Sequence, residues 1–211
     1  MEIVYFGLII LGLICESFAI YSISKNGSTR LPIIWKPLLF LFISGFITDS
    51  LSLVLIFFNS ANFPLLYFYG LFEIICFYFI FRNLSTTKYQ KQILSLILAI
   101  QFLLLICEFI QLSGLLNNFY SNVLNKIVFI VFSIIYAYEE YKSIVSINYS
   151  LATFIVLLVL CFYSLSIFYY SLFEEVIKLE PSVYNVLWPI PVVSTILLNS
   201  IIGWTLWRRG N

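Results

Sequence analysis

Three acidic residues lie in the middle of long apolar segments, where a charged group is costly. Glu16, Asp49 and Glu73 fall near the centres of the first three segments, which we predict to be membrane-spanning helices. Counting about 1.5 Å of rise per residue places all three at a similar depth. A charge there costs roughly 2.5–3.5 kcal/mol even by the most lenient measure. Carboxyl groups kept at that cost are candidates for carrying protons, binding a cation or acting on a water molecule.

The helical faces of these acids indicate that they point into a bundle. Residues three or four positions apart share a face of a helix, and small residues on a face are typical of close helix contact in membranes. Asn199, near the middle of the last apolar segment, has the same kind of neighbours. The small or hydroxyl residues on these faces are Gly12, Gly45, Ser52, Gly70, Thr195 and Gly203.

Glu108 differs from the other acids in its surroundings. It lies in the outer half of the fourth apolar segment and shares a stripe with Gln101 and Gln111. A stripe of polar residues favours contact with water over close helix packing. We therefore predict that Glu108 lines a watery approach to the other candidates.

No lysine or arginine is expected at the depth of Glu16, Asp49 and Glu73, because Lys126 falls at the outer edge of the fifth segment. Three carboxylates in one dry layer cannot all be ionised. They must be protonated, share protons or bind a cation. The alternative is that each acid is neutral and holds two helices together by a hydrogen bond, worth about 0.6–2 kcal/mol.

The sequence predicts neither a metal site nor a cofactor. The chain contains no histidine. Cys15 precedes Glu16 and Cys107 precedes Glu108, but adjacent residues diverge by about 100° on a helix and cannot chelate one ion together.

The composition explains why the acids must sit in a membrane. The chain has 211 residues, of which 62% are hydrophobic and only 10% are charged. A soluble domain has about a quarter charged residues, so most of this surface must face lipid. The apolar runs continue from end to end, and we expect residues 1–211 to form one membrane domain. The net charge of +1 gives no basic field for nucleic acid.

Seven apolar segments are long enough to cross the bilayer, which takes about 20 residues each. The predicted fold is an all-α, polytopic membrane bundle with helices at 3–24, 35–58, 63–82, 92–113, 123–142, 150–173 and 184–207. Pro189 and Pro191 leave two possibilities for the last helix. Either it starts near Pro189, or a longer helix is kinked there.

Basic residues set the expected orientation, because cytoplasmic loops are enriched in lysine and arginine. The first and third loops and the C-terminal tail are basic, whereas the second loop has no basic residue. The basic residues of those two loops and the tail are Lys25, Arg30, Arg82, Lys88, Lys91, Arg208 and Arg209. We predict an N-terminus outside and a C-terminus in the cytoplasm, in a cell membrane such as the inner membrane of a bacterium.

Three functions are consistent with this pattern. The first is a small transporter or permeation module in which Glu16, Asp49 and Glu73 couple to a proton or cation and Glu108 lines the outer approach. The second is a membrane sensor that signals through a membrane partner or a second copy of the chain. The third is an intramembrane lipid hydrolase, although no serine–base pair or HExxH motif supports an enzyme.

Overall fold

The computed structural model of the chain describes residues 2–58, 63–111, 119–143, 151–171 and 189–208, and the secondary structure within these ranges consists of helices joined by short connections. Seven helices lie within these ranges: α1 (Glu2–Arg30), α2 (Trp35–Phe57), α3 (Phe63–Leu84), α4 (Lys88–Gln111), α5 (Phe119–Ser143), α6 (Leu151–Ser171) and α9 (Pro189–Arg208). The predicted all-helical class is therefore confirmed.

Five helices are long and apolar enough to cross a membrane, judged on the described residues. They are Phe6–Arg30 of α1, Trp35–Leu55 of α2, Tyr67–Leu84 of α3, Lys88–Ile110 of α4 and Pro189–Arg208 of α9. The apolar part of α6, Leu151–Leu165, is shorter. Helix α5 carries four charged residues, Lys126, Glu139, Glu140 and Lys142. These findings are compatible with a membrane location.

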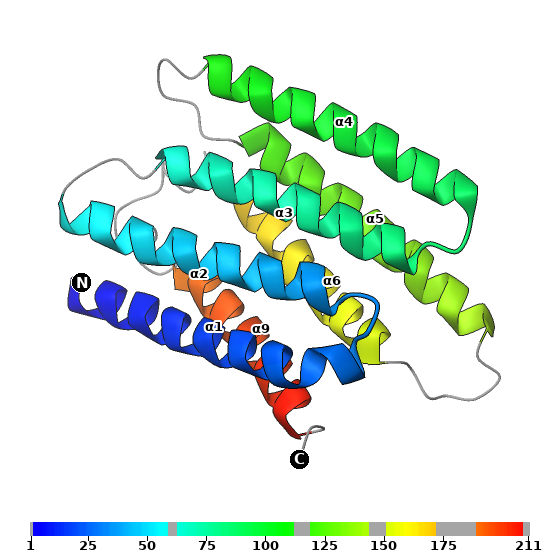
Figure 1. Cartoon of the computed structure of the whole chain (residues 1–211). Coiled ribbons are helices and arrows are strands. Elements are labelled where there is room, and N and C mark those ends of the chain that lie inside the picture. The colour runs from blue at the N-terminus through cyan, green and yellow to red at the C-terminus, as the bar shows by residue number, and fades with distance from the viewer. Residues whose placement is uncertain (1, 59–62, 112–118, 144–150, 172–188, 209–211) are drawn as a thin grey trace.

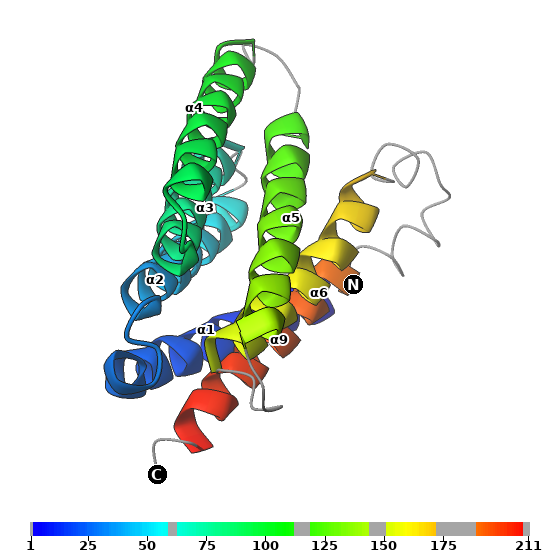
Figure 2. The ribbon, with the colours of Figure 1, turned by 90° about the vertical axis from the view of Figure 1, so that its right-hand side faces the viewer.

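Six helices form a closed ring, and α4 lies outside it. The contacts run from α1 to α2, α3, α5, α6 and α9, and α9 packs against α1 again. Helix α4 packs on α3 and α5 and occupies the edge of the bundle in both views (Figures 1 and 2). Successive described helices run in alternate directions, so the N-terminal end of one helix lies at the same end of the bundle as the C-terminal end of the helix before it (Figure 1).

Helices α1 and α9 pack very closely because glycine leaves room between them. A Cβ atom at Gly203 would lie 2.6 Å from Cδ1 of Phe18 and 3.3 Å from Cα of Ala19. A Cβ atom at Gly12 would meet Ile196 at an ordinary 3.8 Å. Close approach of backbones through glycine is how helices associate in membranes.

The predicted end of the first helix is wrong. Residues 25–30 were expected to form a loop because they are polar, yet α1 continues to Arg30. Asn26 is buried and its Nδ2 donates to the carbonyl oxygen of Leu206 at 3.1 Å. Gly27 is also buried, with its Cα facing Cβ of Trp35. Tertiary contacts with α9 and α2 therefore keep a polar, glycine-containing segment helical.

The structure also defines where α4 and α9 begin. Helix α4 starts at Lys88 and not at residue 92, because Thr87 and Gln90 bond to each other's backbone N–H in a capping box. Helix α9 begins at Pro189 and passes through Pro191 without interruption. The predicted residues 184–188 of the last helix lie outside the described residues, so the choice between a start and a kink at Pro189 stays open.

Candidate functional site

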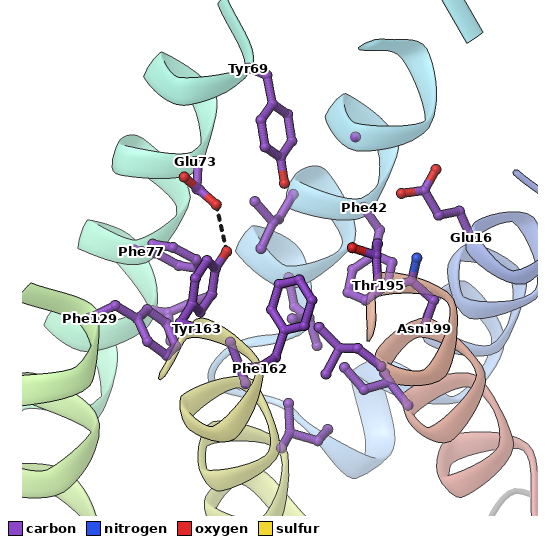
Figure 3. Close-up of a pocket in the computed structure, with 18 of the residues that line it drawn as sticks. Glu16, Phe42, Tyr69, Glu73, Phe77, Phe129, Phe162, Tyr163, Thr195 and Asn199 are labelled. Carbon is purple, nitrogen blue, oxygen red and sulfur yellow. Dashed lines mark hydrogen bonds between the residues drawn. The ribbon is translucent and has the colours of Figure 1, made fainter. Parts of the chain in front are cut away.

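The ring encloses a cavity of about 260 Å³. All six ring helices contribute lining residues, whereas none of the lining residues comes from α4. Four of the five polar candidates line this cavity: Glu16, Asp49, Glu73 and Asn199. Figure 3 shows Glu73 on one side of the space and Glu16 with Asn199 on the other. The fold thus brings these residues from α1, α2, α3 and α9 around one space.

Glu73 is held by hydrogen bonds from two other helices. Its side chain is only 2% exposed. The Tyr163 hydroxyl of α6 donates to Oε1 at 2.5 Å, and Nδ2 of Asn125 in α5 donates to Oε2 at 2.7 Å (Figure 3 shows the first bond). Gln101 of α4 donates in turn to Oδ1 of Asn125 at 3.4 Å. Both oxygens of this carboxyl group therefore have donors.

Lys126 of α5 joins the same group, which corrects the prediction that no lysine lies at this depth. It is 5% exposed, lines the cavity and interacts electrostatically with Glu73. Its Nζ atom lies 5.5 Å from the centre of the Tyr163 ring. We call Glu73, Asn125, Lys126 and Tyr163 the Glu73 cluster. The Lys126 and Glu73 side chains therefore bring groups of opposite charge together at one side of the cavity.

Sequence reasoning missed Asn125, Lys126 and Tyr163. Lys126 was assigned to a loop edge because it falls near the predicted start of the fifth helix. The available signal was the pair Asn125–Lys126 followed by Ser133, which lies on the same helical face seven residues after Lys126. Lys126 and Ser133 are both buried, so α5 turns a polar face inward.

Glu16 of α1 and Asn199 of α9 lie close enough to interact and form a second polar group, which we call the Glu16 pair. Glu16 is 6% exposed and Asn199 3%. Among the described residues, Glu16 Oε2 and Asn199 Nδ2 are both buried without a hydrogen-bond partner. Buried polar atoms without partners are rare in folded proteins. Both side chains face the cavity (Figure 3), so a bound molecule could satisfy them.

Asp49 lies near the Glu16 pair but differs in exposure. It lines the cavity, is exposed and interacts electrostatically with Glu16. No three carboxyl, thiol or imidazole groups within the described ranges lie close enough together to hold a metal ion. The acids are therefore spread along the cavity wall.

Glu108 is not one of the cavity-lining residues. It is half-buried on α4, outside the ring, and interacts with Tyr67 of α3. The predicted polar stripe is also interrupted, because Gln101 turns inward to Asn125 and is buried. The side chain of Gln111 lies outside the described residues. The expectation that Glu108 lines an approach to the other acids thus finds no support in the cavity geometry.

The small residues predicted to accompany the acids have different positions. Gly45 faces Glu16, since a Cβ atom there would lie 3.2 Å from its Oε1. Thr195 lines the cavity and its hydroxyl donates to the carbonyl oxygen of Pro191 at 3.0 Å. Gly12 and Gly203 lie between α1 and α9, Gly70 is buried on α3, and Ser52 is half-buried away from the cavity.

The arrangement suits binding and proton exchange. The carboxyl group of Glu73 has a neighbouring lysine and accepts two hydrogen bonds. The carboxyl group of Glu16 has an acidic neighbour, and its Oε2 has no hydrogen-bond partner among the described residues. The walls between them are largely aromatic and aliphatic. Comparisons of the chain with protein-family models, with curated proteins and with solved structures found no match.

Proposed function

We propose that this chain is a small integral membrane transporter that crosses the bilayer seven times as one domain, with its N-terminus outside. The alternating helix directions support this topology, because they bring basic residues of several helices to one end of the bundle (Figure 1). Six helices contribute in all, α1, α2, α3, α4, α5 and α9, through Lys25, Arg30, Lys36, Arg82, Lys88, Lys91, Lys142 and Arg208. By the bias of basic residues toward the cytoplasm, this end faces inward.

The observation that carries the transport proposal is the Glu16 pair. If Glu16 only held two helices together, its carboxyl oxygens would find donors in the protein, as those of Glu73 do. Asn199 of α9 lies close enough to interact with Glu16 of α1, yet Glu16 Oε2 and Asn199 Nδ2 form no hydrogen bond within the described residues and face a cavity lined by six helices. Ionisable residues in such a place mark ion or substrate pathways in membrane proteins. Glu16 and Asp49 exchange a proton for the bound cation.

A flux measurement in liposomes tests this function. Purified protein is reconstituted into vesicles that contain a pH-sensitive dye, and sodium, potassium or phenyltrimethylammonium chloride is added outside. The last ion is permanently charged and does not cross lipid as a neutral base. We expect at least one of these cations to drive protons out of the vesicles, and we expect Asp49→Asn to reduce that flux strongly.

The matched control is Glu139→Gln, near the C-terminal end of α5 and outside the cavity lining. Glu139 accepts a hydrogen bond from Gln90, and glutamine keeps that acceptor. This variant is expected to transport like the wild type. Absence of cation-driven proton movement at every pH tested, with correctly inserted protein, would refute transport. Cation binding without flux would instead favour the sensor.

A further inference from the structure

We propose that the cavity binds a small organic cation, with its ammonium group between Glu16, Asn199 and Asp49 and its apolar body toward the other end of the cavity. This inference deepens the proposed transport function by naming the class of substrate. It rests on that function only for the claim that the bound cation is carried across the membrane.

The Glu16 pair supplies matching hydrogen-bond groups. Within the described residues, Oε2 of Glu16 is an unpartnered acceptor and Nδ2 of Asn199 an unpartnered donor, on side chains that are 6% and 3% exposed. An ammonium group donates to the carboxylate. A hydroxyl or carbonyl oxygen elsewhere on the ligand accepts from the amide. Gly45 gives the ligand access, because any side chain there would approach Oε1 of Glu16.

The charges along the cavity favour a cation at the Glu16 pair. The charged lining residues are Glu16, Asp49, Glu73 and Lys126. Lys126 compensates Glu73, with which it interacts electrostatically. Glu16 and Asp49 instead repel each other when both are ionised, because the two carboxyl groups lie within electrostatic reach. A cation bound there relieves that repulsion, whereas an anion would add to it.

The other end of the cavity is apolar. On α2, Leu38 and Leu41 precede Asp49, whereas on α3 Ile80 follows Glu73. Helices α2 and α3 run in opposite directions, so these aliphatic residues lie toward the same end (Figure 1). On α6 and α9, four aliphatic lining residues also lie toward this end of the cavity. They are Ile155, Val156, Val159 and Ile202.

The length and walls of the cavity fit an organic ion better than a bare metal ion. Asp49 follows Leu38 by eleven positions, which spans about 16 Å of helix axis at about 1.5 Å per residue. Phe42 and Phe162 lie between the two polar groups (Figure 3). Aromatic faces attract organic cations, and aliphatic walls bury an apolar body. An inorganic ion would find few oxygen ligands along this surface.

Binding of three ligands with similar skeletons tests the inference. Phenethylammonium, phenethyl alcohol and phenylacetate are cationic, neutral and anionic, and each is titrated calorimetrically into the full-length protein in detergent. A charge-assisted hydrogen bond contributes roughly 1.5–3 kcal/mol, so the ammonium compound is expected to bind at least about tenfold more tightly than the alcohol. Phenylacetate is expected to bind most weakly. Equal binding of all three, or preference for phenylacetate, would overturn the proposal.

Replacing Glu16 tests whether this residue causes the preference for phenethylammonium over the alcohol. Glu16→Gln is expected to reduce phenethylammonium affinity by about tenfold while leaving that of the alcohol unchanged. Glu139→Gln should alter neither. If Glu16→Gln fails to fold, the wild-type comparison of the three ligands still decides the question. If Glu16→Gln folds and keeps the full ammonium preference, the assigned position is wrong.

The two proposals fail in different ways. If phenethylammonium binds with the expected preference but no cation moves protons in liposomes, transport is refuted and the ligand class stands. If sodium or potassium drives proton flux but phenethylammonium does not bind, transport stands and the ligand class is refuted.

Discussion

Replacing Lys126 by methionine is expected to destabilise the protein by about 3 kcal/mol. The substitution keeps the length and apolar stem of the side chain but removes its charge. Glu73, which is 2% exposed, then remains without its cationic neighbour. Removing one member of a buried pair typically costs about 3–5 kcal/mol. We expect the lower end because Tyr163 and Asn125 still donate hydrogen bonds to the carboxyl group.

Glu73→Gln is the complementary variant, because the surrounding hydrogen bonds can adapt to it. If the glutamine oxygen keeps the bond from Tyr163, the NH2 group that replaces Oε2 cannot accept from Nδ2 of Asn125, but the amides of Asn125 and Gln101 can both turn over. Asn125 then accepts from residue 73 and donates to Gln101. The main loss is therefore the charge opposite Lys126, and we again expect a cost of about 3 kcal/mol.

The double variant measures the interaction itself. A buried ion pair replaced by two neutral side chains often costs little, so Glu73→Gln with Lys126→Met should lose no more stability than either single variant. That outcome corresponds to a coupling energy of about 3 kcal/mol, at the upper end for neighbouring residues. Free energies of unfolding are measured by titrating the detergent-solubilised protein with sodium dodecyl sulfate and following tryptophan fluorescence.

Lys142→Met is the control, at the other end of the same helix. Lys142 is exposed and lies 4.5 Å above the Tyr138 ring, so its loss should cost no more than about 1 kcal/mol. Our reasoning is refuted if the effects of Glu73→Gln and Lys126→Met simply add, with a coupling energy within about 0.5 kcal/mol of zero.

Two glycine substitutions test the packing and the cavity separately. Gly203→Ala places a methyl group 2.6 Å from the ring of Phe18 and should lower the free energy of unfolding by about 1–3 kcal/mol. Gly7→Ala on α1, with no atom within 4 Å, should be nearly neutral in the same titration, and equal effects would contradict the packing argument. Gly45→Ala places a methyl group 3.2 Å from Oε1 of Glu16 and should weaken phenethylammonium binding in calorimetry without lowering stability by more than about 1 kcal/mol. Unchanged affinity would show that the ligand does not approach this side of the carboxyl group.

The helices were predictable from sequence because apolar runs and their polar ends set them locally. The middle of every described helix falls within a predicted one. The error at the end of α1 arose because Asn26 and Gly27 favour a loop when considered alone. What keeps them helical is contact with Leu206 and Trp35, which are distant in sequence or belong to another helix. Such tertiary contacts are not visible in the local pattern.

The candidate site was only partly accessible for a related reason. Equal depth can be estimated by counting residues, and Glu16, Asp49 and Glu73 do line one cavity. Partners cannot be counted in this way, because they depend on which helices are neighbours. The position of α5 beside α3 and α6 decides that Glu73 meets Lys126 and Tyr163, whereas Glu16 meets neither.

This unequal supply of partners has a consequence for how the protein could move. The Glu73 cluster connects α3, α5 and α6, whereas the Glu16 pair belongs to α1 and α9, which are packed together through Gly203. The two polar groups face each other across the cavity (Figure 3). A cation held by the Glu16 pair, with its body between the groups, contacts both sets of helices at once. Transporters move substrates by rocking one helix bundle against another around a central site. A ligand at this boundary is therefore placed where its binding and release can change how the two sets pack.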